Sequence, residues 1–358
     1  MSYPIKNENI GKLGYNEWIQ SVDTEYIKNE FSLARVIEVN RNSYMVSDGS
    51  HEMSAELSGK FMFDAEQTSD FPTVGDWVAI QALDNYTLAI VHSVLPRKSL
   101  LKRKEAGKRV GFQLIAANID FGLIVQSAEH PNLNLLDRYF VMLNESGIEP
   151  IVVFSKIDLL SIAEQDDLKG VLSKLGNRYL FVSNVVENGV KTLSDNLVAG
   201  RTYCLLGQSG VGKTSLLNRL LGKDSFRIGE VREKDGKGRH TTVRRQLTCL
   251  DSGSIFIDTP GMRELGNFEI KSGLDQTFDE FSAYALKCRF RNCTHTHEEG
   301  CAIIEAIEKG EIEEGRFKNY LKLKKESEFY GMSYHEKRKK DKSFGKMVKN
   351  YNKRAIKG

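Results

Sequence analysis

The sequence predicts a multidomain protein with an N-terminal all-β module, a central α/β domain and a C-terminal, mainly helical domain. Short apolar runs broken by turn residues occupy residues 33–96, and from about residue 120 apolar runs alternate with longer helical patterns. After about residue 272 the strand patterns end, and a cluster of cysteine and histidine residues follows. The 358 residues, 40% of them hydrophobic, suffice for two or three domains.

The N-terminal module is predicted from short apolar runs at residues 34–39, 44–46, 76–80 and 86–94, separated by turns such as Asp48-Gly49. Such spacing is typical of a small barrel or of a sandwich, and the runs alone leave both open.

Six strands are predicted in the central domain, at residues 121–126, 151–154, 179–182, 203–206, 243–250 and 255–257. Several of these runs are continuously apolar, as expected for strands buried on both faces of a mostly parallel sheet. In the C-terminal part, residues 274–286, 302–308 and 316–328 are predicted helices. A helical domain this small has difficulty building a core unaided, so a structural metal would help it.

The sequence pattern does not favour a secreted or a membrane-spanning protein. The N-terminus lacks a positive cluster followed by an apolar run, and no apolar stretch approaches the roughly 18 residues of a membrane span. We therefore expect a cytoplasmic protein with no membrane segment. Three of the five cysteines lie between residues 288 and 301, which in that compartment indicates metal binding rather than disulfides.

Charge is distributed unevenly along the chain. The net charge is +3, but residues 316–358 contain 15 basic and 4 acidic side chains, a balance of +11, so residues 1–315 carry −8. A basic end on an acidic body favours a polyanionic partner. A solvated helix with a flexible end is the alternative interpretation.

The strongest motif is a phosphate loop, G-x-x-x-x-G-K-[ST], with a predicted strand before it and a predicted helix after it. Its glycines let backbone N–H groups surround phosphate oxygens at a helix N-terminus. Lys213 is expected to reach the β- and γ-phosphates, and the Thr214 hydroxyl to bind Mg²⁺. The residues expected to bind nucleotide here are Gly207, Gln208, Ser209, Gly210, Val211, Gly212, Lys213, Thr214 and Ser215.

A second motif follows the strand at 151–154. Ser155, Lys156, Ile157 and Asp158 resemble the [NT]-K-x-D motif with which GTPases read guanine, with serine in place of the usual asparagine. A carboxylate at Asp158 can accept both N–H donors of the guanine edge, which adenine lacks. By itself this segment is also compatible with a surface loop. Ser183-Asn184, after the next strand, is a weaker candidate for a further guanine-contacting loop.

Two further segments fit the switches of a GTPase. Asp258 and Gly261 belong to a D-x-x-G sequence, where Asp258 would hold Mg²⁺ through water and the Gly261 N–H would meet the γ-phosphate. In the glycine-rich segment 236–242, Thr242 is predicted to supply a hydroxyl to Mg²⁺. Met262 occupies the position of the usual water-orienting glutamine, and His240 is the nearest polar substitute. We therefore predict catalytic roles for His240, Lys213 and Thr242, with a structural His240 as the alternative.

The order of these motifs is unusual. The base-reading motif at 155 precedes the phosphate loop at 207 and the switches near 242 and 258, whereas ordinary GTPases have the phosphate loop first. The domain is therefore predicted to be circularly permuted, which preserves the pocket because chain ends that lie close together can be joined.

The C-terminal cluster has the pattern Cys288-x4-Cys293-x-His295-x5-Cys301. Three thiolates and one imidazole form the closed tetrahedral set of structural Zn²⁺ sites, with no open position for water chemistry. His297 competes with His295 as the fourth ligand, and spacing leaves both open.

A basic and aromatic surface is predicted near the C-terminus. Arg289 and Arg291, with the later run 337–340, Phe344 and Tyr351, are the residue types that contact phosphates and stack on RNA bases.

Taken together, the chain resembles the bacterial ribosome small-subunit-dependent GTPases, a family of circularly permuted GTPases. The resemblance extends over nearly the whole chain. It rests on Gly75-Asp76-Trp77-Val78, Ala116-Ala117-Asn118-Ile119-Asp120, GQSGVGKTS from Gly207, GRHTT from Gly238, DTPGMRE from Asp258 and CRFRNCTHTHEEGC from Cys288. Within the family, Ser155 departs from the usual residue.

The resemblance implies an N-terminal OB-fold barrel, a permuted GTPase domain and a zinc-binding domain. It implies GTP and GDP as ligands with Mg²⁺, one structural Zn²⁺ bound by His295 rather than His297, and a role for His240 in hydrolysis. The implied partner is the small ribosomal subunit with its rRNA, whose maturation would be coupled to GTP hydrolysis and release. We expect a monomer with boundaries at 1–103, 104–272, 273–334 and a tail at 335–358. The alternative function is an RNA-binding assembly factor or chaperone in which nucleotide is only a conformational ligand.

Overall fold

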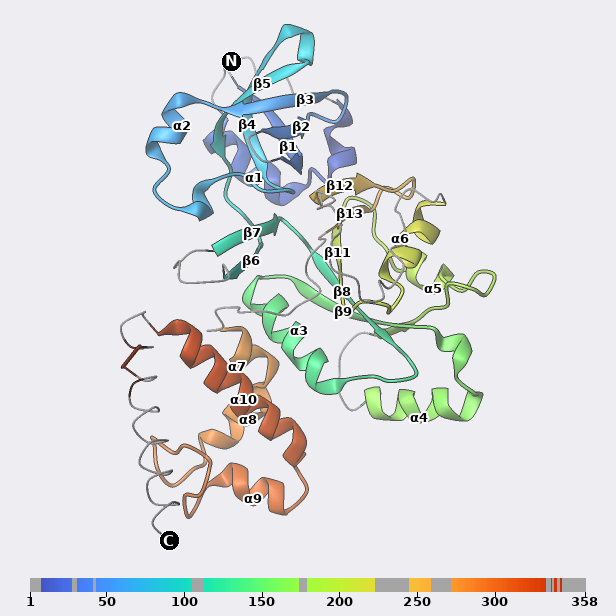
Figure 1. Cartoon of the computed structure of the whole chain (residues 1–358), viewed down its shortest axis with the longest axis vertical. Helices are drawn as coiled ribbons and strands as arrows, with labels where there is room; N and C mark the ends of the chain where they lie inside the picture. Colours follow the sequence, from blue (N-terminus) through green and yellow to red (C-terminus); the bar gives the residue numbers. More distant parts are fainter. Residues whose placement is uncertain are drawn as a thin grey trace. The chain divides into compact units, whose positions relative to one another are not determined.

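The computed structural model divides the chain into two compact units, residues 1–266 and 267–358 (Figure 1). The structure describes residues 8–27, 31–40, 43–104, 112–173, 179–222, 245–258 and 272–332, together with residues 336, 338, 339 and 342. Among these residues, no helix combines the length and the apolar character needed to cross a membrane.

The first unit contains a closed five-stranded barrel. Its strands are β1 (Ser32–Val39), β2 (Tyr44–Ser47), β3 (Glu52–Leu57), β4 (Trp77–Leu83) and β5 (Leu88–Val94). The order is β1-β2-β3-β5-β4, and a β4–β1 pairing closes it. Only the β3–β5 pair of the barrel is parallel. Alternate apolar residues such as Val36, Val46 and Val78 fill the interior, as the period-two strand pattern requires.

Short helical segments accompany the barrel. A 3-10 helix, η1 (Glu8–Leu13), and helix α1 (Glu17–Tyr26) contribute Ile10 and Ile19 to a second apolar cluster that contains Trp77 of β4. Helix α2 (Gly59–Asp64) begins after Ser58, whose hydroxyl accepts a hydrogen bond from the Phe61 N–H (3.1 Å). The other two are 3-10 turns, η2 (Thr68–Asp70) and η3 (Asp84–Tyr86).

The second part of the first unit is an α/β sheet. Its strands are β8 (Phe121–Ser127), β9 (Glu149–Ser155), β10 (Tyr179–Phe181), β11 (Thr202–Leu206), β12 (Arg245–Cys249) and β13 (Ile255–Asp258). The order is β10-β9-β8-β11-β13-β12, and only β12 runs antiparallel. The accompanying helices are α3 (Leu133–Glu145), η4 (Ile157–Leu159), α4 (Ile162–Ser173), α5 (Lys191–Ser194) and α6 (Lys213–Leu221). Because five strands are parallel, their carboxyl ends share one edge, where α/β proteins bind ligands.

The barrel and the α/β sheet are hydrogen-bonded to each other, because β1 pairs with β12 as well as with its barrel neighbours (Figure 1). Glu38 of β1 lies opposite Gln246 of β12, and Gln246 lies opposite Asp258 of β13. One row of backbone partners therefore leads from the barrel to the end of β13.

Arg35 of β1 is fully buried at this junction. Its guanidinium donates to three carbonyl oxygens and one hydroxyl, those of Leu13 (2.6 Å), Gly75 (3.1 Å), Asn118 (3.2 Å) and Thr202 (Oγ1, 3.0 Å). Burial lowers the pKa of Arg35 to about 10. The rigid fork of five N–H donors lets this one side chain satisfy acceptors from four separate segments.

A hairpin of β6 (Leu100–Lys104) and β7 (Phe112–Ala117) connects the barrel to β8. Arg245, the first residue of β12, donates from Nη1 to the Leu114 carbonyl oxygen of this hairpin (2.5 Å). The start of β12 is therefore held by the hairpin as well as by β1.

The second unit is helical in its described part, with α7 (Gly273–Thr277), α8 (Asp279–Ala285), α9 (Ala302–Glu308) and α10 (Glu314–Gly331). Its core depends on aromatic rings: Phe281 contacts Phe317 and Tyr320 edge to face, at centroid distances of 5.3 and 5.1 Å. Arg316 donates from Nε to Glu280 (2.6 Å) and lies over the ring of Phe278.

This architecture confirms the predicted fold class: a small barrel, a mostly parallel α/β sheet and a helical C-terminal unit. The six central strands and the helix at 302–308 lie where the sequence predicted them, whereas the predicted helix at 274–286 is divided between α7 and α8. Strand β3 and the β6–β7 hairpin were not predicted. The hairpin strands contain Lys102, Arg103 and Gln113, so their apolar pattern is weak.

Candidate nucleotide-binding site and metal centre

The predicted phosphate loop joins β11 to α6. Gly207 has φ of +140°, and a Cβ there would lie 2.2 Å from the Val125 carbonyl oxygen, so only glycine fits. Gly212, with φ of +90°, is the N-cap of α6. The other predicted members occupy the loop and the first turn of α6: Gln208, Ser209, Gly210, Val211, Lys213, Thr214 and Ser215. This strand–loop–helix connection presents backbone N–H groups at a helix N-terminus, the arrangement that binds phosphate.

Lys213 is bound to its own loop. Its ammonium group donates to the carbonyl oxygens of Gly207 (2.8 Å) and Gln208 (2.5 Å). A lysine that binds phosphate would have to exchange these two neutral acceptors for charged oxygens, and charge-assisted hydrogen bonds are the stronger kind.

The predicted base-reading segment is attached to the predicted phosphate loop through Ser155. This residue ends β9 and is fully buried, and its hydroxyl lies 2.7 Å from the Val211 carbonyl oxygen and 3.1 Å from that of Gln126. At the position where the [NT]-K-x-D motif usually has asparagine, the serine side chain links the two loops. Lys156 follows with a left-handed φ of 59°, and Ile157 and Asp158 begin the turn η4, with Asp158 exposed.

Ser183 and Asn184 lie beside the same loop. The side-chain amide of Asn184 donates from Nδ2 to the Gly212 carbonyl oxygen (3.3 Å), and the backbone carbonyl oxygen of Asn184 accepts from Arg219 Nε of α6 (2.9 Å). The Ser183 hydroxyl accepts from the N–H groups of Val185 and Val186, which shapes the turn. Three segments far apart in the sequence therefore meet at the carboxyl edge of the sheet.

Asp258 ends β13, the strand next to β11, so it lies at the same edge as the phosphate loop. Burial raises the pKa of Asp258 above the ordinary aspartate value, and the neighbouring Lys213 charge acts in the opposite direction. The other predicted switch residues, His240, Thr242, Gly261 and Met262, lie outside the described residues.

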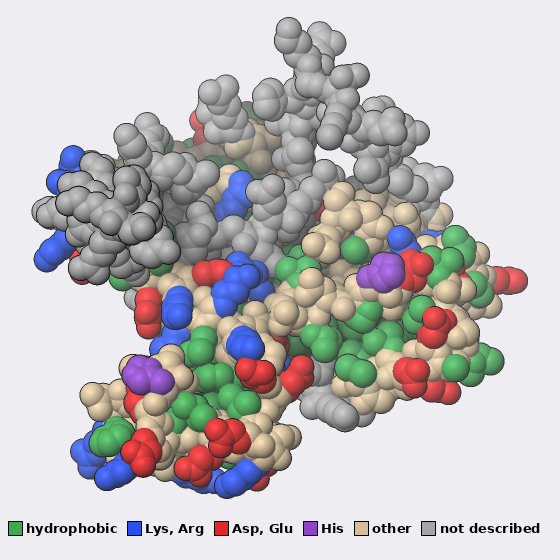
Figure 2. Space-filling model, turned by 60° about the horizontal axis from the view of Figure 1, so that its bottom comes forward, with side chains coloured by type: hydrophobic (Ala, Val, Ile, Leu, Met, Phe, Trp, Pro, Cys, Tyr) green, Lys and Arg blue, Asp and Glu red, His purple; other side chains and the backbone are tan. Residues whose placement is uncertain are grey.

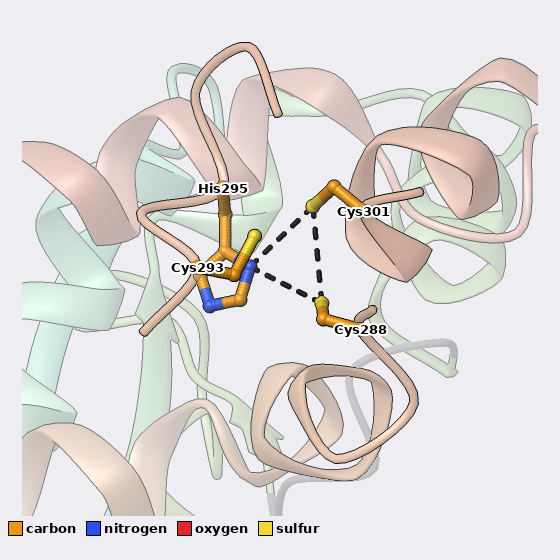
Figure 3. Close-up of side chains that lie close together, drawn as sticks. All are labelled: Cys288, Cys293, His295 and Cys301. Carbon is orange, nitrogen blue, oxygen red and sulfur yellow. Dashed lines mark hydrogen bonds between the residues drawn. The ribbon is translucent and has the colours of Figure 1, made fainter. Parts of the chain in front are cut away.

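The predicted metal ligands meet in the second unit. The potential ligand atoms of Cys288, Cys293, His295 and Cys301 all lie within 4.8 Å of one another (Figure 3). His295 Nδ1 lies 3.5 Å from Cys288 Sγ and 3.4 Å from Cys301 Sγ, and these two sulfurs are 3.9 Å apart. Around a tetrahedral zinc ion, sulfur ligands are about 3.8 Å from each other and sulfur–nitrogen pairs about 3.5 Å. The four side chains therefore have the spacing of a closed tetrahedral metal site.

His295 and His297 differ in their surroundings. His295 has a left-handed φ of 58° and lies within the cluster, whereas the His297 ring nitrogen Nδ1 lies 2.8 Å from the Thr296 hydroxyl. The structure thus brings His295, and not His297, together with the three cysteines.

Glu298 supports the ligand loop, and sequence reasoning did not identify it. Its carboxylate accepts hydrogen bonds from the hydroxyl and the N–H of Thr294 and from the N–H groups of Thr296 and His297. These bonds, foremost those from Thr294, lower the pKa of Glu298 well below its usual range. A glutamate three residues after a histidine ligand was visible in the sequence, but only the structure shows that its carboxylate binds the loop backbone.

The basic surface predicted for the second unit is described only in part. Arg289 lies over the ring of Phe290, whose side chain is 47% exposed. On the side of the molecule drawn in Figure 2, acidic and basic side chains are interspersed among the described residues. Lys337, Lys340, Phe344 and Tyr351 lie outside the described residues.

Comparison with known proteins agrees with this geometry. The family model for the RsgA GTPase matches residues 94–268. A protein of Vibrio parahaemolyticus named small ribosomal subunit biogenesis GTPase RsgA 2 is 37% identical over 355 residues, covering 98% of this chain and 93% of the relative. The chain belongs to the RsgA GTPase family. A Bacteroides thetaiotaomicron relative named RsgA 1 is 32% identical over 355 residues and 98% of both chains.

Solved structures agree with the RsgA assignment. YjeQ from Thermotoga maritima superimposes with a TM-score of 0.62 and 27% identity, over 85% of this chain and 100% of that one. A second structure, YloQ, described as a circularly permuted GTPase, has a TM-score of 0.61 over 85% of this chain and 97% of that one, at 24% identity, and shows the same fold. The predicted family and permuted fold are thereby confirmed.

Proposed function

We propose that this RsgA-family protein is a GTPase that acts in the biogenesis of the small ribosomal subunit, binding the subunit with GTP and leaving it after hydrolysis. The names of its relatives support a role in the biogenesis of the small ribosomal subunit. The proposal rests on the hydrogen bonds that join the phosphate loop to Ser155 and to Asn184 at one edge of the sheet. These contacts support the proposal that one nucleotide binds across the phosphate loop and the segment of Ser155 to Asp158.

The proposed roles of the site residues follow from their chemistry. Lys213 leaves its loop carbonyls for the β- and γ-phosphates, and Asp158 accepts the guanine N–H donors of GTP or GDP. Mg²⁺ bound with the nucleotide would neutralise phosphate charge. Thr214 and Asp258 are its ligands in this proposal, Asp258 through water, with Thr242, Gly261 and His240 completing the switches and the hydrolytic site as predicted from the sequence.

Zn²⁺ is the metal proposed for the cluster of Cys288, Cys293, His295 and Cys301. The sulfur and nitrogen donors and their tetrahedral spacing suit it, and four protein ligands leave no position for reactive water. The ion would therefore hold the chain between α8 and α9 in shape, compensating for the small core of the second unit.

The remaining proposals concern partners and location. We assign rRNA binding to the basic C-terminal part, since residues 316–358 carry a net charge of +11. We also propose that the protein is monomeric and cytoplasmic. The domain boundaries proposed are 1–103 for the barrel, 104–272 for the GTPase domain, 273–334 for the zinc domain and 335–358 for the tail.

The deciding experiment compares hydrolysis of GTP and ATP with and without purified small ribosomal subunits. We expect GTP to be preferred and its turnover to rise with subunits. Lys213→Ala should abolish this turnover, whereas the matched control Lys169→Ala, which loses an exposed ion pair with Asp166, should leave it unchanged. Binding of GTP without subunit-stimulated turnover would instead support an assembly factor that uses nucleotide as a conformational ligand.

A further inference from the structure

Arg219 of α6 connects two parts of the nucleotide domain that are 35 residues apart in the sequence. Its Nε donates to the backbone carbonyl oxygen of Asn184 (2.9 Å), although the side chain as a whole is exposed. Arg219 lies in the last turn of α6, and long side chains of a helix extend back toward its N-terminus. This side chain therefore ties the turn after β10 to the helix that follows the predicted phosphate loop.

The turn after β10 is closed by its own hydrogen bonds. The Ser183 N–H donates to the Gly189 carbonyl oxygen (2.9 Å), and the Ser183 hydroxyl accepts from the Val185 N–H (3.2 Å). The peptide group between Asn184 and Val185 is thus held at its N–H by Ser183 and at its oxygen by Arg219. Because the turn is bonded within itself, a contact that fixes Asn184 fixes the whole turn.

The sheet itself gives this turn little support. Strand β10 has three residues and lies at the end of the strand order, where β9 is its one neighbour among the described strands. A short edge strand has few hydrogen bonds, so the turn beyond it opens at low free energy unless other contacts hold it. Two such contacts come from α6, one between Asn184 Nδ2 and the Gly212 carbonyl oxygen (3.3 Å) and one from Arg219. The bond from Arg219 is the shorter one and has a charged donor, which makes it the stronger kind.

We propose that Arg219 is a positioning residue for base recognition: it holds the turn at Ser183 and Asn184, which is predicted to contact guanine, in a fixed place relative to the phosphate loop. A nucleotide that spans both then binds to a preformed site and does not have to order the turn. The inference rests on the proposed nucleotide-binding function and assigns a part in it to a residue outside all the sequence motifs. The affinity that the base contributes should therefore depend on Arg219, whereas the affinity that the phosphates contribute should not.

The test is the Arg219→Met variant of the full-length protein, in which a long side chain with good helix propensity replaces the donor. By titration calorimetry we expect Mg²⁺·GDP to bind about 3- to 10-fold more weakly than to the wild type, the range for one lost hydrogen bond. Inorganic pyrophosphate with Mg²⁺ has no base and is measured as a competitor of GDP. Its inhibition constant should stay within about twofold of the wild-type value, because the phosphate loop is unchanged.

Arg201→Met is the matched control. Arg201 is also exposed, and its Nη1 lies 3.3 Å from Asp120 Oδ1. It immediately precedes β11, whereas the phosphate loop follows the other end of that strand. We therefore expect this variant to bind GDP and pyrophosphate as the wild type does.

The outcomes separate the inference from the proposed function. If Arg219→Met binds GDP within about twofold of the wild type, the inference is overturned and the proposed function stands. Equal weakening of GDP and pyrophosphate also overturns the inference, because Arg219 would then support the phosphate loop or the fold as a whole. A wild-type protein that does not bind GDP, or that binds ADP as tightly, overturns the proposed function and the inference together.

Discussion

Replacing Ser155 by alanine tests whether the serine performs the linking role at a position where GTPases usually have asparagine. The hydroxyl has one hydrogen and two carbonyl acceptors, at 2.7 Å (Val211) and 3.1 Å (Gln126), in a fully buried site. Removing it deletes one net hydrogen bond and leaves the nearer carbonyl without this donor, a loss of about 1–2 kcal/mol. Because the bond is part of the folded structure, some of this free energy is lost from the stability of the fold and the remainder from the order of the phosphate loop.

We therefore expect Ser155→Ala to bind GTP and GDP about 3- to 10-fold more weakly, equally for both because the contact is to the loop and not to a phosphate. The preference for GTP over ATP should persist, since the proposed base-reading group is the Asp158 carboxylate. Calorimetric titration with each nucleotide measures this, alongside urea denaturation.

The control is Ser99→Ala, which removes a similarly buried hydroxyl that donates to the Ile119 carbonyl oxygen (2.7 Å) away from the phosphate loop. It should lower the free energy of unfolding and leave nucleotide affinity unchanged. Equal nucleotide affinities for the wild type and Ser155→Ala would refute the linking role, and a lost preference for guanine would show that Ser155 contributes to base reading.

Three further predictions concern the metal, the junction and the acidic residue of the switch. Replacing His295 by alanine should abolish stoichiometric zinc, measured by atomic absorption, whereas His297→Ala should retain it; the reverse result would exchange their roles. Arg35→Met should lower the free energy of unfolding by about 3 kcal/mol in urea, because four buried acceptors lose a charged donor; a change below about 0.5 kcal/mol would mean that water replaces it. Burial raises the pKa of Asp258 in the folded state, so ionisation of this carboxyl reduces the stability of the fold as the pH rises above the unfolded pKa near 4. Asp258→Asn should therefore be more stable than the wild type at pH 7. It should also bind Mg²⁺·GDP more weakly. An Asn variant with unchanged or lower stability at pH 7 would contradict the burial argument.

The parts of the candidate site that could be predicted from the sequence are those formed by residues close together in the chain. The loop from Gly207 to Ser215 and the cysteine cluster have fixed spacing because a helix N-terminus or a metal ion fixes their geometry locally. Hydrogen bonds between segments that are distant in the sequence gave no such signal. Arg35 is separated from Asn118 by 83 residues and from Thr202 by 167, so only the folded chain shows that they share hydrogen bonds.

The same limit applies to finer details of the site. The residue Ser155 differs from the family motif in sequence, but the structure shows that its hydroxyl reaches Val211 from the end of β9. Roles predicted for His240, Thr242 and Gly261 remain predictions.

The pairing of β1 with β12 has a mechanical consequence. Strand β12 begins at Arg245, three residues after Thr242, and backbone positions Glu38, Gln246 and Asp258 lie in line across β1, β12 and β13. Neighbouring strands are about 4.8 Å apart, so the carboxylate expected to sense magnesium is attached to a strand only two ladder steps from the barrel. Hydrogen-bonded ladders are stiff, and no flexible linker intervenes along this row. A force applied to the barrel would therefore be transmitted through β12 to β13 and to the proposed nucleotide site at its carboxyl end.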